Sequence, residues 1–79
     1  MPRLVGVNRY RMVDLQSGMV VMVFTTYPGL RVLDSCQRAC QELDIDPGVG
    51  TYRIDHLKQH TASGQLRWVK LYRFVLESE

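Results

Sequence analysis

The chain is predicted to be one α+β domain, residues 1–79, with elements in the order ββαββ. We expect a four-stranded, mainly antiparallel sheet with one helix packed on one face. Two observations carry this prediction. Residues 65–76, QLRWVKLYRFVL, form a long strand-like run that is apolar on both faces. Residues 28–44 instead repeat their apolar side chains at helical spacing.

The helix is predicted to run from about residue 28 to residue 44. Pro28 suits a first helical position, and Asp46, Pro47 and Gly48 end the pattern. One apolar stripe follows the helix: Val32, Leu33, Cys36, Ala39, Cys40 and Leu43. This stripe predicts the face that packs on the sheet.

The strands are predicted at residues 3–14, 19–26, 51–59 and 65–76. Turn residues at 14–18 and 61–64 join them into two hairpins that flank the helix. Residues 51–59 would also suit a short helix with Ile54 and Leu57 inward. The strand is preferred because the turn at 61–64 connects it to the last strand, which places Asp55 opposite Lys70.

The second and fourth strands are the most apolar, so they are predicted to be central, in the order 1-2-4-3. Helix, strand and aromatic positions together give a predicted core: Val21, Val23, Val32, Leu33, Cys36, Ala39, Cys40, Leu43, Ile54, Trp68, Tyr72 and Phe74. Apolar residues left over on these two strands would face outward.

Composition narrows the class of protein. A hydrophobic content of 46% excludes a disordered chain. No apolar run approaches the ~18 residues of a membrane span, and the first residues lack a secretory signal, so we expect a cytoplasmic protein without a membrane partner. A chain this short buries a small core, which is compatible with a homodimer or a bound partner.

Charge is distributed unevenly along the chain. The first, third and fourth strands carry eight basic residues against Asp55, a net charge of +7. The remainder, including Asp14 in the first turn, carries two arginines against seven acidic residues, a net charge of −5. Because arginine presents a rigid donor fork, this pattern suits contacts with phosphates, carboxylates or a protein surface, and a purely solvated sheet face is an equal alternative.

Cysteine and histidine raise the question of zinc. Cys36 and Cys40 precede His56 and His60 at a spacing near that of Cys2His2 sites. On a strand, however, the two histidines would be ~13 Å apart and could not share one metal ion. We therefore expect two reduced core thiols and neither metal nor cofactor. The common phosphate-loop and metalloprotease motifs are absent from the sequence, so no enzymatic activity is predicted.

The predicted binding residues are arginines on the strands with one tyrosine as a stacking anchor: Arg9, Tyr10, Arg11, Arg53 and Arg73. Such a surface suits a non-enzymatic protein-binding module that blocks or adapts a larger protein or ribonucleoprotein complex. Small inhibitors from phages and mobile elements, including inhibitors of CRISPR effectors, fall in this size class. The alternative is a nucleic-acid-binding domain that uses a basic, aromatic sheet face.

Overall fold

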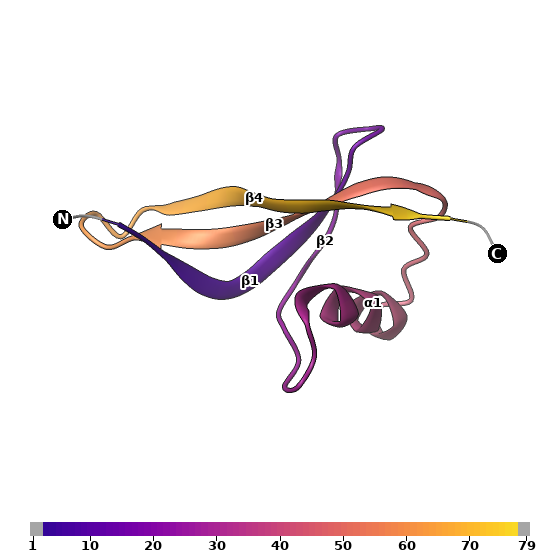
Figure 1. Cartoon of the computed structure of the whole chain (residues 1–79), viewed down its shortest axis with the longest axis horizontal. Helices are drawn as coiled ribbons and strands as arrows, with labels where there is room; N and C mark the ends of the chain where they lie inside the picture. The colour runs from indigo at the N-terminus through magenta and orange to yellow at the C-terminus, as the bar shows by residue number, and fades with distance from the viewer. Residues whose placement is uncertain (1–2, 78–79) are drawn as a thin grey trace.

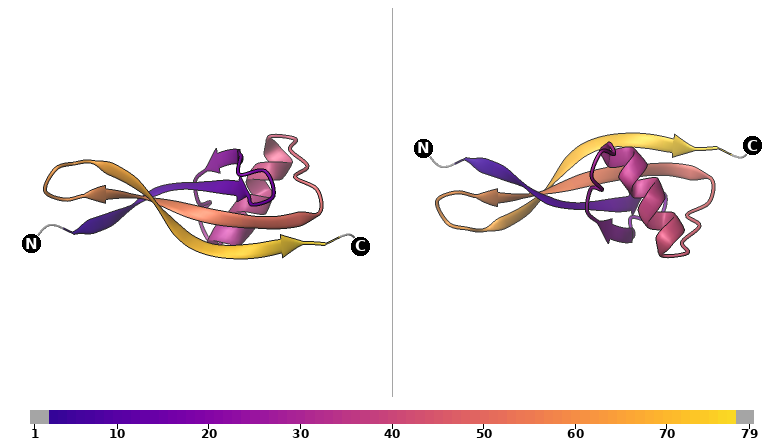
Figure 2. Two further views of the ribbon diagram at one scale, coloured as in Figure 1. Left: turned by 90° about the horizontal axis from the view of Figure 1, so that it is seen from above. Right: turned by 90° about the horizontal axis from the view of Figure 1, so that it is seen from below.

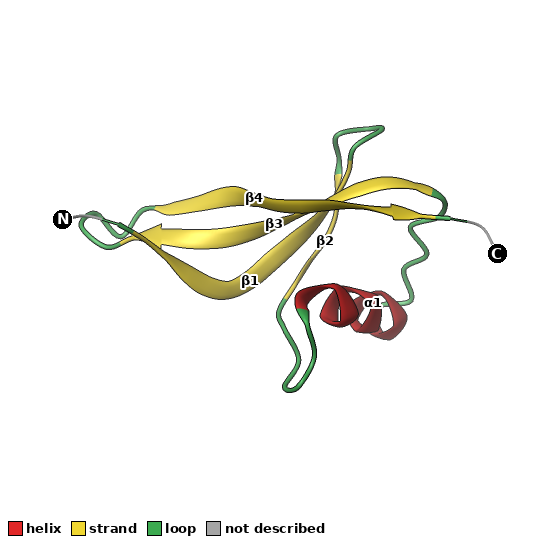
Figure 3. Cartoon of the chain, in the orientation of Figure 1, coloured by secondary structure: helices red, strands yellow, loops and turns green. Residues whose placement is uncertain are grey.

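The computed structural model describes residues 3–77 and has the predicted ββαββ order (Figure 3). The elements are β1 (Leu4–Asp14), β2 (Val20–Phe24), α1 (Val32–Glu42), β3 (Gly50–His60) and β4 (Leu66–Leu76). All four strands form one sheet with α1 against one face, so the predicted fold class is confirmed. Residues 51–59 are a strand, and Asp55 lies opposite Lys70 as predicted.

The strand order is β2-β1-β3-β4, with every neighbouring pair antiparallel. The predicted order 1-2-4-3 is therefore wrong, and β4 is an edge strand. The central positions belong to β1 and β3, which carry many of the charged residues. Their charges are tolerated there because Asp55 on β3 is paired with Arg11 and Arg53.

The helix begins later than predicted, at Val32 rather than at residue 28. Pro28 and Gly29 instead form a tight turn in which Leu30 N–H donates to Tyr27 O at 3.0 Å. Gly29 has φ +79°, so Pro28 and Gly29 fit the second and third positions of a type II turn. Ser35 Oγ accepts a hydrogen bond from Tyr27 N–H at 3.0 Å, which fastens this turn to the helix.

The core lies between α1 and the facing side of the sheet. Its buried members are Met12, Met22, Phe24, Cys36, Ala39, Tyr52 and Ile54. Three predicted core residues are exposed, Val23 by 49%, Leu43 by 56% and Tyr72 by 37%, and Trp68 is half-buried on the opposite face. On β2 the pairing shifts between Met12 and Val13 of β1, and Met22 and Phe24, rather than Val23, face the helix.

A one-residue bulge in β4 decides which side chains share a face. Arg73 pairs with Arg53 and Lys70 pairs with Asp55, so three positions of β4 span two positions of β3. Leu71 is the additional residue. Lys70 and Arg73 consequently point to the same side of the sheet, and Trp68 joins them.

The helix covers only part of the sheet. The molecule measures 48 × 28 × 17 Å, whereas an 11-residue helix is ~16 Å long. Figures 1 and 2 show the β3–β4 hairpin and the start of β1 extending well beyond α1. No helix within residues 3–77 has the length and apolar character to cross a membrane.

Candidate binding surface

The sheet surface turned away from α1 gathers most of the charged strand residues. We call it the arginine face and define it by Arg11, Arg53, Asp55, Trp68, Lys70 and Arg73. Residues on β1, β3 and β4 share this face because cross-strand partners point to the same side of a sheet. The opposite side holds Met12, Ile54 and Phe74, which pack toward the helix.

An ion triad forms the centre of the arginine face. Asp55 is 1% exposed and accepts hydrogen bonds from Arg11 Nε at 2.7 Å and from Arg53 Nε at 2.6 Å. A further bond joins Arg53 Nη2 to Asp55 Oδ2 at 3.1 Å. Burial raises the pKa of the Asp55 carboxyl, but the hydrogen bonds and charges of Arg53 and Arg11 outweigh it and hold the pKa below its usual value. Asp55 is therefore a structural anion that orients the two guanidinium groups.

Trp68 lies beside the triad on β4. The Arg11 guanidinium carbon sits 4.6 Å from the centre of the Trp68 ring, a cation–π contact. Arg11 thus bridges a carboxylate and an aromatic ring. Its guanidinium also occupies one face of the indole, which limits what else can stack there.

Lys70 and Arg73 are the accessible cations of this surface. Both are exposed, and neither takes part in an ion pair among residues 3–77. Arg73 lies directly opposite Arg53, a like-charged pair that is unfavourable by itself. With Asp55 as the one acidic member of the defined set, the arginine face carries a net charge of +3.

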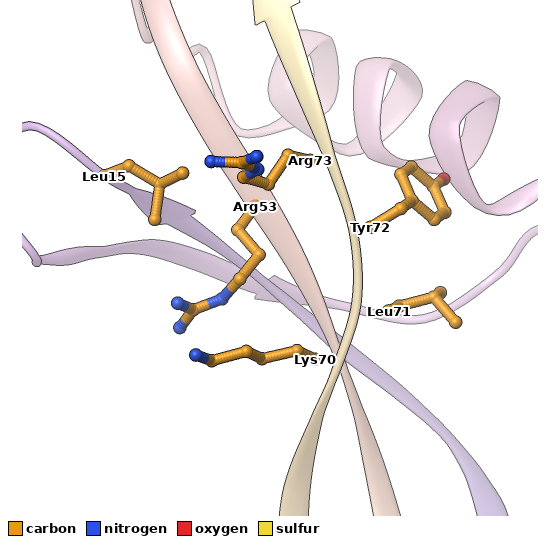
Figure 4. Close-up of a pocket in the computed structure, with 6 residues that line it drawn as sticks. All are labelled: Leu15, Arg53, Lys70, Leu71, Tyr72 and Arg73. Atoms are coloured by element: carbon orange, nitrogen blue, oxygen red, sulfur yellow. The ribbon is translucent and has the colours of Figure 1, made fainter.

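A shallow pocket of about 340 Å³ opens beside these cations. Figure 4 shows Arg53, Lys70 and Arg73 projecting to one side of β4 together with Leu15. Leu71 and Tyr72 also line the pocket, but their side chains extend to the other side of β4 (Figure 4). Three convergent cations with an aliphatic wall suit a carboxylate or phosphate group.

The predicted binding residues fall into three groups. Arg11, Arg53 and Arg73 are brought together on the arginine face. Arg9 is exposed but lies where the β1–β3 pairing is interrupted between Gly6 and Tyr10. Arg9 therefore has no paired residue on β3 that would place it on the arginine face.

Tyr10 lies on the other side of the sheet, so its predicted place among the arginines is wrong. It is half-buried and packs against the core cluster under α1. Its ring stacks on His56 at 4.3 Å and on Phe24 at 5.7 Å between centroids. The residues that the sequence reasoning missed are Lys70 and Trp68. Counting by twos from the predicted core positions Tyr72 and Phe74 places both on the helix side, whereas the predicted pairing with Asp55 places Lys70 on the other side. No sequence signal marked the bulge that reconciles the two.

A second pocket, of about 380 Å³, separates α1 from β4. Its lining is mainly apolar: Met12, Leu33, Cys36, Gln37, Cys40, Gln41, Pro47, Phe74 and Leu76. Cys36 Sγ lies 3.7 Å from Met12 Sδ, and burial raises the pKa of the Cys36 thiol to about 12. A thiol with so high a pKa is a poor nucleophile at neutral pH. Among residues 3–77, no three His, Cys, Asp or Glu side chains are grouped to hold a metal ion.

No protein-family model, curated protein or solved structure matches this chain. The fold and the arginine face define a small α+β protein with a basic sheet face.

Proposed function

We propose that this chain is a non-enzymatic protein-binding module whose arginine face docks on an acidic surface of a larger protein or ribonucleoprotein complex. The observation that carries the proposal is the cluster of Arg53, Lys70 and Arg73 around one pocket. Among residues 3–77, Lys70 and Arg73 form no ion pair, and Arg53 opposes Arg73 across the strands. An external carboxylate would relieve this repulsion and would gain hydrogen bonds from rigid donors.

Nucleic-acid binding is the alternative, and the distribution of aromatic side chains disfavours it. Base recognition on a sheet needs exposed rings on which bases can stack. Tyr10, Tyr52 and Tyr72 lie on the helix side, whereas Trp68 is half-buried beneath Arg11. The arginine face, as defined, therefore offers charge without an open stacking platform.

In this proposal the protein acts by occlusion of its partner's surface. A small module that covers an acidic patch of a larger machine would block or adapt it without any chemistry of its own. Inhibition of a host complex such as a CRISPR effector, by a phage or mobile-element protein, is the case in this class to test first.

The test is a pull-down from a lysate of the source organism, followed by affinity measurements on the captured partner. Arg73→Ala and Lys70→Ala are the informative variants because both side chains are exposed and outside the triad. Each is expected to weaken binding about thirtyfold, the equivalent of ~2 kcal/mol. Arg31→Ala is the matched control, since Arg31 is an exposed arginine beside α1 with no side-chain hydrogen bond to the helix end.

Nuclease treatment and salt separate the two functions. Capture that survives nuclease and depends strongly on one or two cations supports protein binding. Capture that is lost with nuclease and weakens with a log–log salt slope of about −0.7 per phosphate contact would establish the nucleic-acid alternative. Equal binding by all three variants would exclude Lys70 and Arg73 from the interface.

A further inference from the structure

The outer edge of β4 is long and open. β4 has 11 residues and, within the part of the chain that the structure describes, pairs with β3 alone, so one row of its backbone donors and acceptors has no strand partner there. The opposite edge of the sheet differs, because β2 has only five residues and lies against α1. Most of β4 is exposed, including Leu66, Leu71 and Val75. Figure 1 shows this edge running past the helix along the length of the molecule.

The hairpin geometry identifies which amides face outward. His60 N–H donates to Gln65 O at 2.9 Å, so these two residues form a hydrogen-bonded pair. Bonded and non-bonded pairs alternate along an antiparallel ladder. Counting along the register up to the bulge, the backbone groups of Leu66, Trp68 and Lys70 point away from β3. Those of Arg67 and Val69 point toward it.

The positive charge of β4 determines which kind of strand can pair with its open edge. β4 contains Arg67, Lys70 and Arg73 and no acidic residue. Pairing with a second copy of β4 would bring six cations together, so the edge resists self-association. An extended segment rich in carboxylates would be attracted instead, because its Cβ atoms would lie about 4.5–5.5 Å from those of the basic residues directly opposite.

The two sides of β4 differ in the side chain they would accept. Lys70 and Arg73 stand on the arginine face, where alternate residues of an added strand would point. The other side carries Tyr72, Phe74 and Leu76 and opens onto the apolar pocket beside α1. An incoming strand would therefore fit best if acidic and apolar residues alternated along it.

We propose that β4 accepts an extended acidic segment of the partner as a fifth strand. Glutamate or aspartate side chains would face Lys70 and Arg73, and apolar side chains would face the pocket between α1 and β4. This inference rests on the proposed function, because it gives the form that the acidic partner takes at the same surface.

The probe is a synthetic, end-capped peptide of about nine residues in which glutamate alternates with valine and threonine. Hydrogen exchange of the ¹⁵N-labelled protein is followed by NMR with and without peptide. At 90% occupancy, exchange at Leu66, Trp68 and Lys70 is expected to slow about tenfold, since these amides gain a partner only when a strand is added. Arg67 and Val69, which already donate to β3, are the internal control and should change little.

A peptide of the same sequence, with every amide N-methylated, tests whether the backbone is used. It keeps the charge but cannot donate along either edge, so strand addition requires it to lose binding. Equal binding of both peptides, weakened by Arg73→Ala, would overturn the fifth-strand model and leave the proposed acidic contact intact. Absence of binding by the unmethylated peptide, or a dimer of the free protein that protects the same three amides, would also overturn it.

Discussion

Replacing Asp55 by asparagine tests whether the ion triad stabilises the fold. The two side chains have nearly the same volume, so packing at this buried site is preserved. The charge is lost, and the amide places an N–H₂ group where the carboxylate had accepted from Arg11 or Arg53. Two guanidinium groups then remain beside a neutral residue.

The expected loss can be bounded from the burial of the three groups. Removing one partner of a fully buried ion pair costs about 3–5 kcal/mol. The arginine side chains here are 26% and 20% exposed, so water can replace part of what they lose. We therefore expect Asp55→Asn to lower the free energy of unfolding by about 2–3 kcal/mol. For a domain of this size that corresponds to a fall in Tm of about 10–20 °C.

The pH dependence of stability provides a second signature. The pKa of Asp55 is lower in the folded protein than in the unfolded chain. Its stabilising contribution is therefore complete above the unfolded pKa of about 3.9 and is lost as pH falls through the lower, folded value. The stability difference between the wild-type protein and Asp55→Asn should be constant near neutral pH and should shrink below about pH 4.

Urea unfolding followed by circular dichroism measures both effects. Asp46→Asn is the matched control, because Asp46 is exposed and its Oδ1 accepts one bond from Gly48 N–H that asparagine can also accept. The control should change stability by less than about 0.5 kcal/mol. If Asp55→Asn is equally mild, or if its deficit does not narrow in acid, the triad does not stabilise the central strands.

Three further outcomes are expected. Gly6→Ala should destabilise the protein by about 1–3 kcal/mol, because the new Cβ would lie 2.6 Å from the His56 ring. Urea denaturation should show that His56→Ala, added to Gly6→Ala, restores part of the lost stability because its side chain is smaller. In thiol labelling with a disulfide reagent, Cys36 should react much more slowly than Cys40, since it is 2% exposed and burial raises its pKa to about 12; equal rates would mean that α1 opens readily. Protein purified without chelator should contain no stoichiometric zinc, because the cysteines lie on α1 and the histidines on β3; one equivalent that disappears with Cys36→Ser would contradict this.

Local sequence signals identified the elements correctly. Helical spacing of Cys36 and Ala39 marked the buried side of α1, and the turn at residues 61–64 gave the β3–β4 hairpin with its register from the turn to Asp55 and Lys70. These features depend on residues close together in the chain. Turn chemistry and periodicity therefore suffice to predict them.

The predicted strand order is wrong because the apolar content of a strand does not show whether it lies at the centre or at the edge of the sheet. β4 is apolar on both faces yet lies at the edge, whereas β3 holds a buried Asp55 at the centre of the sheet. Arg53 on the same strand and Arg11 from β1, 44 residues away in sequence, together make that position acceptable for a carboxylate. A pairing over such a separation leaves no mark in the local pattern.

Only some of the residues on the arginine face could be placed from the sequence, because the local pattern does not show the bulge in β4. Arginines at positions 11, 53 and 73 follow strict alternation from the helix-facing residues of their own strands, and they were grouped correctly. Lys70 and Trp68 lie beyond the additional residue of β4, where counting by twos gives the wrong side.

The additional residue Leu71 leaves the cross-strand partners of β4 unchanged on either side of it. Deletion of Leu71 would keep Lys70 opposite Asp55 and Arg73 opposite Arg53, so both cations would stay on the arginine face, now two positions apart in a regular strand. A chain with the bulge and a chain without it would therefore present the same cations, although the spacing of these cations along β4 differs. For proteins of this architecture, the residue of β3 that lies opposite a cation is thus a better guide to a shared binding surface than the spacing of cations along β4.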